Sequence, residues 1–145
     1  MSSIETEEIK QYIENKYCRK LEKHLSQKIE VNDIIFEKGS EGSPEGTYVF
    51  YDTEGYHYLF TERGQIGEHV IENNIDHIAY KVMDKYVFDI ALKYATQNRE
   101  QNKDFRKNLF DKQKEIWLFL DKNYYLTKTK EINKILRENP YNDSV

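Results

Sequence analysis

The spacing of apolar residues changes twice along this chain, and that change limits the folds open to it. From Ile4 to Leu25, apolar side chains recur every three or four residues, which is the period of an amphipathic helix. Between residues 31 and 72, short β-branched and aromatic runs replace this pattern, and from Asn73 the helical period returns. The order predicts an α+β fold: an N-terminal helix, a small antiparallel sheet and then three helices packed on one face.

The middle segment, residues 31–72, predicts a β-meander of two to four strands. Residues 47–52 and 56–62 are rich in aromatic and β-branched side chains, and a short glycine-containing turn separates them. Two such runs joined by such a turn are typical of a β-hairpin. The prediction is completed by flanking strands near 34–36 and 65–71 and by a glycine-rich loop over 38–46.

The last part of the chain predicts three helices separated by polar breaks. The first begins at Asn73 and is expected to run to about Arg99. Asp104 is expected to cap the second, and the third is expected from about Thr127 to just before Pro140. With 145 residues, the chain has the length of a single domain. Its expected parts are the helix within 1–30, the meander over 31–72 and the helical part over 73–140.

Acidic residues gather in the predicted sheet. The whole chain carries 26 acidic and 22 basic residues, a net charge of −4. Residues 31–80 hold ten acids and two bases, whereas residues 81–145 hold ten acids and fourteen bases. A surface that mixes carboxylates with tyrosine repels nucleic acid and attracts a basic protein. The mildly basic C-terminal part alternates its charges, which is typical of a solvated helix face rather than a nucleic-acid site.

We therefore expect a protein-binding surface on the hairpin and the strand that follows it. Tyrosine is enriched at binding hot spots because it is large, stiff and amphipathic. Tyr48 and Tyr51 are possible anchors, and one of them must face inward because they are an odd number of residues apart on a strand. The expected partner-binding residues are Tyr48, Tyr51, Asp52, Glu54, Tyr56, His57, Glu68 and Glu72.

The sequence argues against several other classes. No apolar run approaches the roughly 20 residues that span a bilayer, and the first residues lack the pattern of a secretory signal. The single cysteine, Cys18, excludes an internal disulfide framework and is expected to be a buried, inert thiol. We expect a cytoplasmic protein without cofactor or metal that does not bind nucleic acid or membrane, as a monomer or homodimer.

No catalytic signature is present. The four histidines have no helical metal-binding spacing, and the phosphate-binding and nucleophile-elbow motifs do not occur. One alternative is a small hydrolase that uses carboxylates of the sheet, which would need Glu62, Arg63 and His57 to converge in a pocket. Another is an adaptor domain that homodimerises through its tyrosine-rich strands.

A structural role is expected for a second group of polar residues. Glu62 and Arg63 are neighbours at a strand end and point to opposite sides, so each needs a different partner. Arg106 and Gln113 lie seven residues apart and share one helix face. We expect a polar network of Glu62, Arg106 and Gln113, with Arg63 beside it, to fasten the sheet to a helix.

Several stretches together resemble the immunity protein 63 family of bacterial polymorphic-toxin systems. They are GYHYLFTERG, NNIDHIAYKVM, DFRKNLFDKQKEIWLFL and EINKILRENP, within about residues 45–140. The resemblance rests on the order and spacing of Tyr58, Glu62 to Gly64, Asp104 to Arg106, Phe110, Gln113, Glu131, Ile132 and Pro140. It implies a non-enzymatic protein that binds and neutralises a cognate toxin and so protects the producing cell, without saying which toxin. The acidic, tyrosine-rich composition itself suits an inhibitor of a basic toxin, for instance a nuclease.

Overall fold

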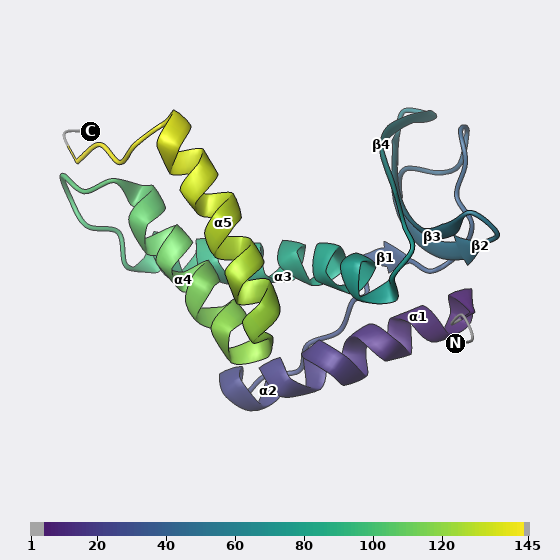
Figure 1. Cartoon of the computed structure of the whole chain (residues 1–145), viewed down its shortest axis with the longest axis horizontal. Coiled ribbons are helices and arrows are strands. Elements are labelled where there is room, and N and C mark those ends of the chain that lie inside the picture. The colour runs from purple at the N-terminus through teal and green to yellow at the C-terminus, as the bar shows by residue number, and fades with distance from the viewer. Residues whose placement is uncertain (1–4, 144–145) are drawn as a thin grey trace. The chain divides into compact units, whose positions relative to one another are not determined.

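The computed structural model describes residues 5–143, and it confirms the predicted order of helix, sheet and three helices. The chain divides into two compact units, Met1–Lys81 and Val82–Val145. Figure 1 shows the elements of both units. They are α1 (Thr6–Ile13), η1 (Glu14–Cys18), α2 (Arg19–Leu25), β1 (Ile34–Ile35), β2 (Gly46–Asp52), β3 (Gly55–Glu62), β4 (Gln65–Glu72), α3 (Ile75–Gln97), α4 (Phe105–Leu120) and α5 (Lys122–Glu138).

The first unit begins with one continuous helical segment, α1–η1–α2, in which η1 is a wider π turn. Four residues of its apolar stripe are fully buried, as the helical period predicts: Ile9, Ile13, Tyr17 and Leu21. Tyr12 and Leu25 are half-buried, and Ile4 lies outside the described residues. The segment ends where Ser26 takes a left-handed backbone conformation with φ of 56°. Cys18 is buried as expected, and burial raises the pKa of its thiol to about 12, so the thiol is not a nucleophile at neutral pH.

The four strands of the first unit lie in sequence order, β1-β2-β3-β4. The pairs β2–β3 and β3–β4 are antiparallel, which is the predicted meander. The pairing of β1 with β2 differs from the prediction, because Ile34 lies beside Thr47 in a parallel register. A parallel neighbour requires the chain to return before β2, and the loop over 36–45 makes that return.

The register of the meander assigns side chains to two faces of the sheet, because residues directly opposite each other share a face. On the first face, Val49, Tyr58 and Val70 form one row across the three strands. On the second face, Tyr48, Leu59 and His69 form another row. We refer to these as the Tyr58 face and the Leu59 face.

The loop over 36–45 covers one end of the Leu59 face. Tyr48 is 4% exposed, and its hydroxyl donates a hydrogen bond of 2.6 Å to the Pro44 carbonyl. Gly39 lies so close to the ring that an added Cβ would come within 2.5 Å of Tyr48 Cγ. Only glycine can therefore bring the loop backbone down onto this ring. Tyr48, Phe50 and Leu59 form a small core under the loop.

The second unit contains the rest of α3 together with α4 and α5, and α4 packs against α5. Its core contains the fully buried Trp117, whose indole Nε1 donates to Asp84 at 3.0 Å. Asp84 also pairs with Lys128 at 2.8 Å, and Lys128 is 7% exposed. A buried cation requires such a partner, so this pair fixes α5 against α3.

The predicted end points of the last three helices are partly right. Asp104 caps α4 as expected, because its Oδ1 accepts from the Arg106 amide at 3.0 Å. The predicted start of the last helix near Thr127 is wrong, since α5 begins at Lys122. The cause is Asp121, which is extended and caps α5, so the two helices follow each other with a single residue between them.

Candidate protein-binding site

The eight residues expected to bind a partner differ in their accessibility. Glu54 and Glu68 are exposed, and Tyr51, Asp52 and Glu72 are half-buried. The other three are buried, with exposures of 3–6%: Tyr48, Tyr56 and His57. The sequence could not identify these three as buried, because the loop that covers Tyr48 and the stacking partners of the other two are set by tertiary structure.

The eight residues also lie on different faces. Tyr51, Tyr56 and Glu72 form one row on the Tyr58 face, and Glu68 shares that face through its pairing with Phe60. The remaining strand residues, Tyr48, Asp52 and His57, lie on the Leu59 face, and Glu54 lies in the β2–β3 turn. No single face of the sheet can therefore present all the predicted carboxylates.

A chain of hydrogen bonds crosses the Leu59 face from β2 to β4. His57 Nε2 donates to Asp52 Oδ1 at 2.7 Å, because a carboxylate can only accept. His57 Nδ1 lies 2.8 Å from His69 Nε2, and in neutral His57 this nitrogen accepts. The His57 ring also stacks on Phe50, with ring centroids 4.4 Å apart. The hydrogen bond from His57 lowers the pKa of Asp52, which stays ionised.

The hairpin turn determines which backbone groups of the sheet face outward. Asp52 and Gly55 close a two-residue turn and therefore exchange backbone hydrogen bonds. Counting in twos along β3, residues 55, 57, 59 and 61 bond to β2, and residues 56, 58, 60 and 62 bond to β4. The β4 residues that bond back to β3 are consequently Gln65, Glu68, Val70 and Glu72.

The backbone groups of His69 and Ile71 accordingly point away from the sheet. β4 is the last strand, and among the described residues only β3 pairs with it. Ile66 and Ile71 are 41% and 42% exposed, so β4 presents apolar side chains as well as free backbone groups. We call this side of β4 the open edge. The sequence does not reveal the open edge, because alternation alone does not show whether a strand is internal or terminal.

The opposite edge is closed. The same counting places the backbone groups of Tyr51 away from β3, toward the other side of β2. There the Tyr51 amide donates to Thr6 Oγ1 at 2.9 Å, and the Thr6 hydroxyl donates to the Tyr51 carbonyl at 3.3 Å. Further along the same side, Thr47 is paired with β1. We call this side of β2 the closed edge.

Two carboxylates of the open edge already have a lysine or histidine beside them. Glu68 pairs with Lys81 at 2.8 Å, and Lys81 also lies 4.8 Å from the centre of the Tyr58 ring. Glu72 lies 3.2 Å from His77 Nδ1. These pairs are exposed and weak, so a basic side chain from a partner can compete for the same carboxylates.

Glu62, Arg63 and His57 do not converge in a pocket, as the hydrolase alternative would need. Glu62 and His57 are five residues apart on β3, which at roughly 3.3 Å per residue separates them by about 16 Å. Arg63 lies in the exposed turn after Glu62, with φ of 54°. His57 instead uses both ring nitrogens for Asp52 and His69. Within residues 5–143 no cluster of three or more side chains could hold a metal ion.

Arg106, expected in a polar network, makes its contacts inside the second unit. Its guanidinium bonds to both carboxylate oxygens of Asp104 and donates to the carbonyls of Asn139 and Pro140. The Asp104 carboxylate also accepts from the Asn142 amide at 2.8 Å. These bonds hold the pKa of Asp104 well below its usual range. Asp104 and Arg106 thus clamp the C-terminal segment onto the start of α4, and Gln113 is buried further along that helix.

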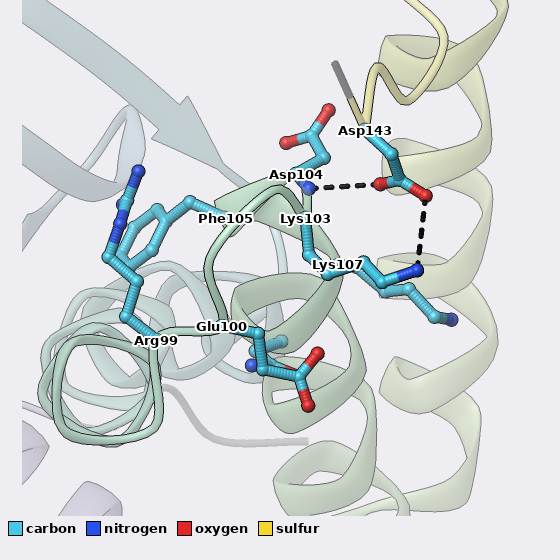
Figure 2. A pocket seen from close by; sticks show the side chains of 8 residues that line it. Arg99, Glu100, Lys103, Asp104, Phe105, Lys107 and Asp143 are labelled. Carbon is cyan, nitrogen blue, oxygen red and sulfur yellow. Dashed lines mark hydrogen bonds and ion pairs between the residues drawn. The ribbon is translucent and has the colours of Figure 1, made fainter. Parts of the chain in front are cut away.

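A pocket of about 380 Å³ lies beside this clamp (Figure 2). Asp143 is one of its lining residues. Its carboxylate accepts a hydrogen bond from the Asp104 amide at 3.0 Å and lies 3.9 Å from Lys103 Nζ. Arg99 lies over the Phe105 ring. The lining holds both signs of charge and contains no serine, threonine, cysteine or histidine: Arg99, Glu100, Lys103, Asp104, Phe105, Lys107, Asn108 and Asp143.

The basic residues along α4 have acidic neighbours. Lys107 and Lys114 both lie within 4 Å of Asp111, and Lys112 pairs with Glu115 at 2.6 Å. This is the interleaved pattern predicted for a solvated helix face. In the described part of the chain, no helix is both long enough and apolar enough to cross a bilayer.

The fold thus defines a mixed α+β protein with helices on either side of a small sheet in the sequence. A family model described as Immunity protein 63 matches residues 52–134, which is more than half of the 145 residues. The chain therefore belongs to the immunity protein 63 family, as its resemblance predicted. No curated protein and no solved structure gives a match. Membership supports a role in immunity in general terms.

Proposed function

We propose that this protein binds a cognate toxin and neutralises it through the acidic end of its sheet. The carboxylates that carry the proposal are Glu54, Glu68 and Glu72, together with Asp52. The toxin is a protein with a basic surface, for instance a nuclease, made in the same cell, where neutralisation protects the producer and its kin. The proposal implies that the protein acts in the cytoplasm, in a system of bacterial competition.

The distribution of exposed charge is the observation that supports this proposal. In residues 31–80 seven acids are exposed and only two bases are present: Asp33, Glu37, Glu41, Glu45, Glu54, Glu62 and Glu68. Fixed charge of one sign accelerates encounter with an oppositely charged protein and selects against partners of the same sign. Tyr51, half-buried and packed on Tyr56 with ring centroids 4.7 Å apart, supplies a stiff aromatic contact next to the carboxylates.

Charge reversal with a matched control tests the surface. The variant carries Glu54→Lys, Glu68→Lys and Glu72→Lys, and the control carries Asp111→Lys, Glu115→Lys and Glu138→Lys in α4 and α5. The two variants have the same net charge, and all six positions are exposed or half-buried. Asp52 is left unchanged because it bonds to buried His57. The probe is the toxin domain encoded in the neighbouring reading frame, in a catalytically inert form, measured by calorimetry.

We expect the wild-type chain and the α4–α5 control to bind within a few-fold of each other. The sheet variant should bind on the order of 100-fold more weakly because opposite charges at the contact become like charges. Equal loss in both variants would mean that only the total charge matters and would refute the assignment to this surface. No binding by the wild-type chain would refute neutralisation by direct contact with that toxin.

A further inference from the structure

The open edge has three properties that a binding strand requires. β4 is eight residues long, and His69 and Ile71 direct their backbone groups out of the sheet. Ile71 offers an apolar side chain that is 42% exposed. β4 contains neither lysine nor proline, although Glu68, Glu72 and an irregular pairing opposite Phe60 and Thr61 restrict which segment can pair with it. Exposed edges accept an extended segment from another chain, whose backbone continues the ladder.

We propose that the toxin adds an extended segment to the open edge, pairing with His69 and Ile71 and carrying lysine or arginine opposite Glu68 and Glu72. This proposal rests on the proposed function, because it specifies how the same partner is held. Glu68 and Glu72 both lie on the Tyr58 face, so alternate side chains of one added strand can oppose both of them.

Charge decides between a toxin segment and a second copy of this chain. The only charged side chains of β4 are Glu68 and Glu72, apart from His69 if it is protonated. Pairing of β4 with β4 of another copy would bring four carboxylates together without a lysine or arginine on either strand. Like charges opposite each other on a sheet are destabilising, whereas a basic segment gains an ion pair at each carboxylate. The edge therefore favours a basic partner strand over a homodimer.

The first test blocks the backbone of the edge and leaves the rest of β4 in place. Ile71→Pro removes the outward amide and places the proline ring where the incoming strand would pair. Because that amide does not bond to β3, the ladder between β3 and β4 keeps its hydrogen bonds. The matched control is Ile71→Thr, which loses the same apolar contact but keeps the amide and a β-branched side chain.

The binding of both variants is measured by calorimetry against the inert toxin domain from the neighbouring reading frame, with circular dichroism to verify folding. We expect Ile71→Pro to bind at least about tenfold more weakly than Ile71→Thr. This factor corresponds to the loss of roughly one backbone hydrogen bond, together with the clash between the proline ring and the incoming strand. Equal binding by the two variants would overturn the proposal even if the wild-type chain binds well. In that result the proposed function would stand and only its mode would fail.

A second test uses the wild-type protein and so avoids any folding defect in the proline variant. Amide hydrogen exchange is followed by NMR in the free protein and in its complex with the same toxin domain. In the free protein the inward amides of Val70 and Glu72 should be protected, and the outward amides of His69 and Ile71 should exchange fast. On binding, the two outward amides should slow at least about tenfold. Unchanged exchange at both in a saturated complex would overturn strand addition.

Light scattering on the free protein measures its mass and tests whether a second copy of the chain occupies the open edge. A concentration-dependent dimer in which His69 and Ile71 become protected without toxin would assign the open edge to a second copy and would overturn the proposal.

Discussion

The outer sides of β2 and β4, two strands of similar length, are finished differently. At the closed edge, the backbone of Tyr51 is bonded by the hydroxyl of Thr6, and β1 pairs beside Thr47. At the open edge, the corresponding groups of His69 and Ile71 have no strand beside them in the described structure. The difference shows that a residue of the first helix can hydrogen-bond the outward backbone groups of β2. The outward backbone groups of β4 have no strand beside them in the described structure.

The two edges also differ in their relation to the family. The match over residues 52–134 contains the hairpin turn, β3 and β4, and therefore the whole open edge. Thr6, β1 and nearly all of β2 lie outside it. The part of this chain that defines its family thus includes the surface proposed to bind the toxin, whereas the elements that close the other edge are outside the matched region.

The largest effect on the free energy of unfolding is expected from a buried residue on the central strand of the meander, between the two edges. Leu59 is 2% exposed at the centre of the sheet, so Leu59→Ala should lower the free energy of unfolding by about 2–5 kcal/mol through lost burial and a cavity. Ile66→Ala, at the 41%-exposed position of the open edge, is the matched control and should change it by less than about 0.5 kcal/mol. Urea unfolding measures both. Equal losses would show that the open edge is packed like the core.

A smaller effect is expected from opening the closed edge. Thr6→Val keeps the shape of the side chain but removes the hydroxyl that serves both backbone groups of Tyr51. The free energy of unfolding should fall by about 1 kcal/mol, the usual contribution of a partly buried hydrogen bond. Thr6→Ser retains the hydroxyl and should stay close to wild type. If Thr6→Val changes neither the free energy of unfolding nor the amide exchange rate at Tyr51, Thr6 does not close this edge.

The hydrogen-bond chain across the Leu59 face should give a pH-dependent effect. Because the pKa of Asp52 is lowered in the folded state, its contribution to stability is present above the ordinary carboxyl pKa of about 3.9 and is lost as pH falls below it. We expect the difference in Tm between wild type and Asp52→Asn to be constant near neutral pH and to shrink below about pH 4. A difference that stays constant down to about pH 2.5 would contradict a role for the ionised carboxylate.

The smallest effect on stability is expected at the open edge itself. Ile71→Thr exchanges one exposed β-branched side chain for another, so the free energy of unfolding should stay within about 0.5 kcal/mol of wild type. A loss near that of Leu59→Ala would mean that Ile71 belongs to the core and is not available to a partner.

The sequence predicted the order of elements because local periodicity decides it. The first helix, the hairpin and the capped start of α4 at Asp104 all follow from side chains close together in the chain. The predicted start of α5 was wrong because Asp121 both ends α4 and caps α5. A break of a single residue does not interrupt the apolar periodicity. The concentration of acids in the middle third is likewise a property of the sequence alone.

Tertiary structure decided which of the predicted residues reach the surface. Tyr48 and His57 satisfied every local criterion for a binding residue, yet the return loop at Gly39 and the stacking on Phe50 bury them. The identity of the open edge is also a tertiary property, because a strand becomes terminal only when nothing pairs beside it. Hydrophobic spacing acts over a few residues, whereas strand order and coverage depend on contacts between residues far apart in the chain, and those contacts separate the buried tyrosines from the accessible edge.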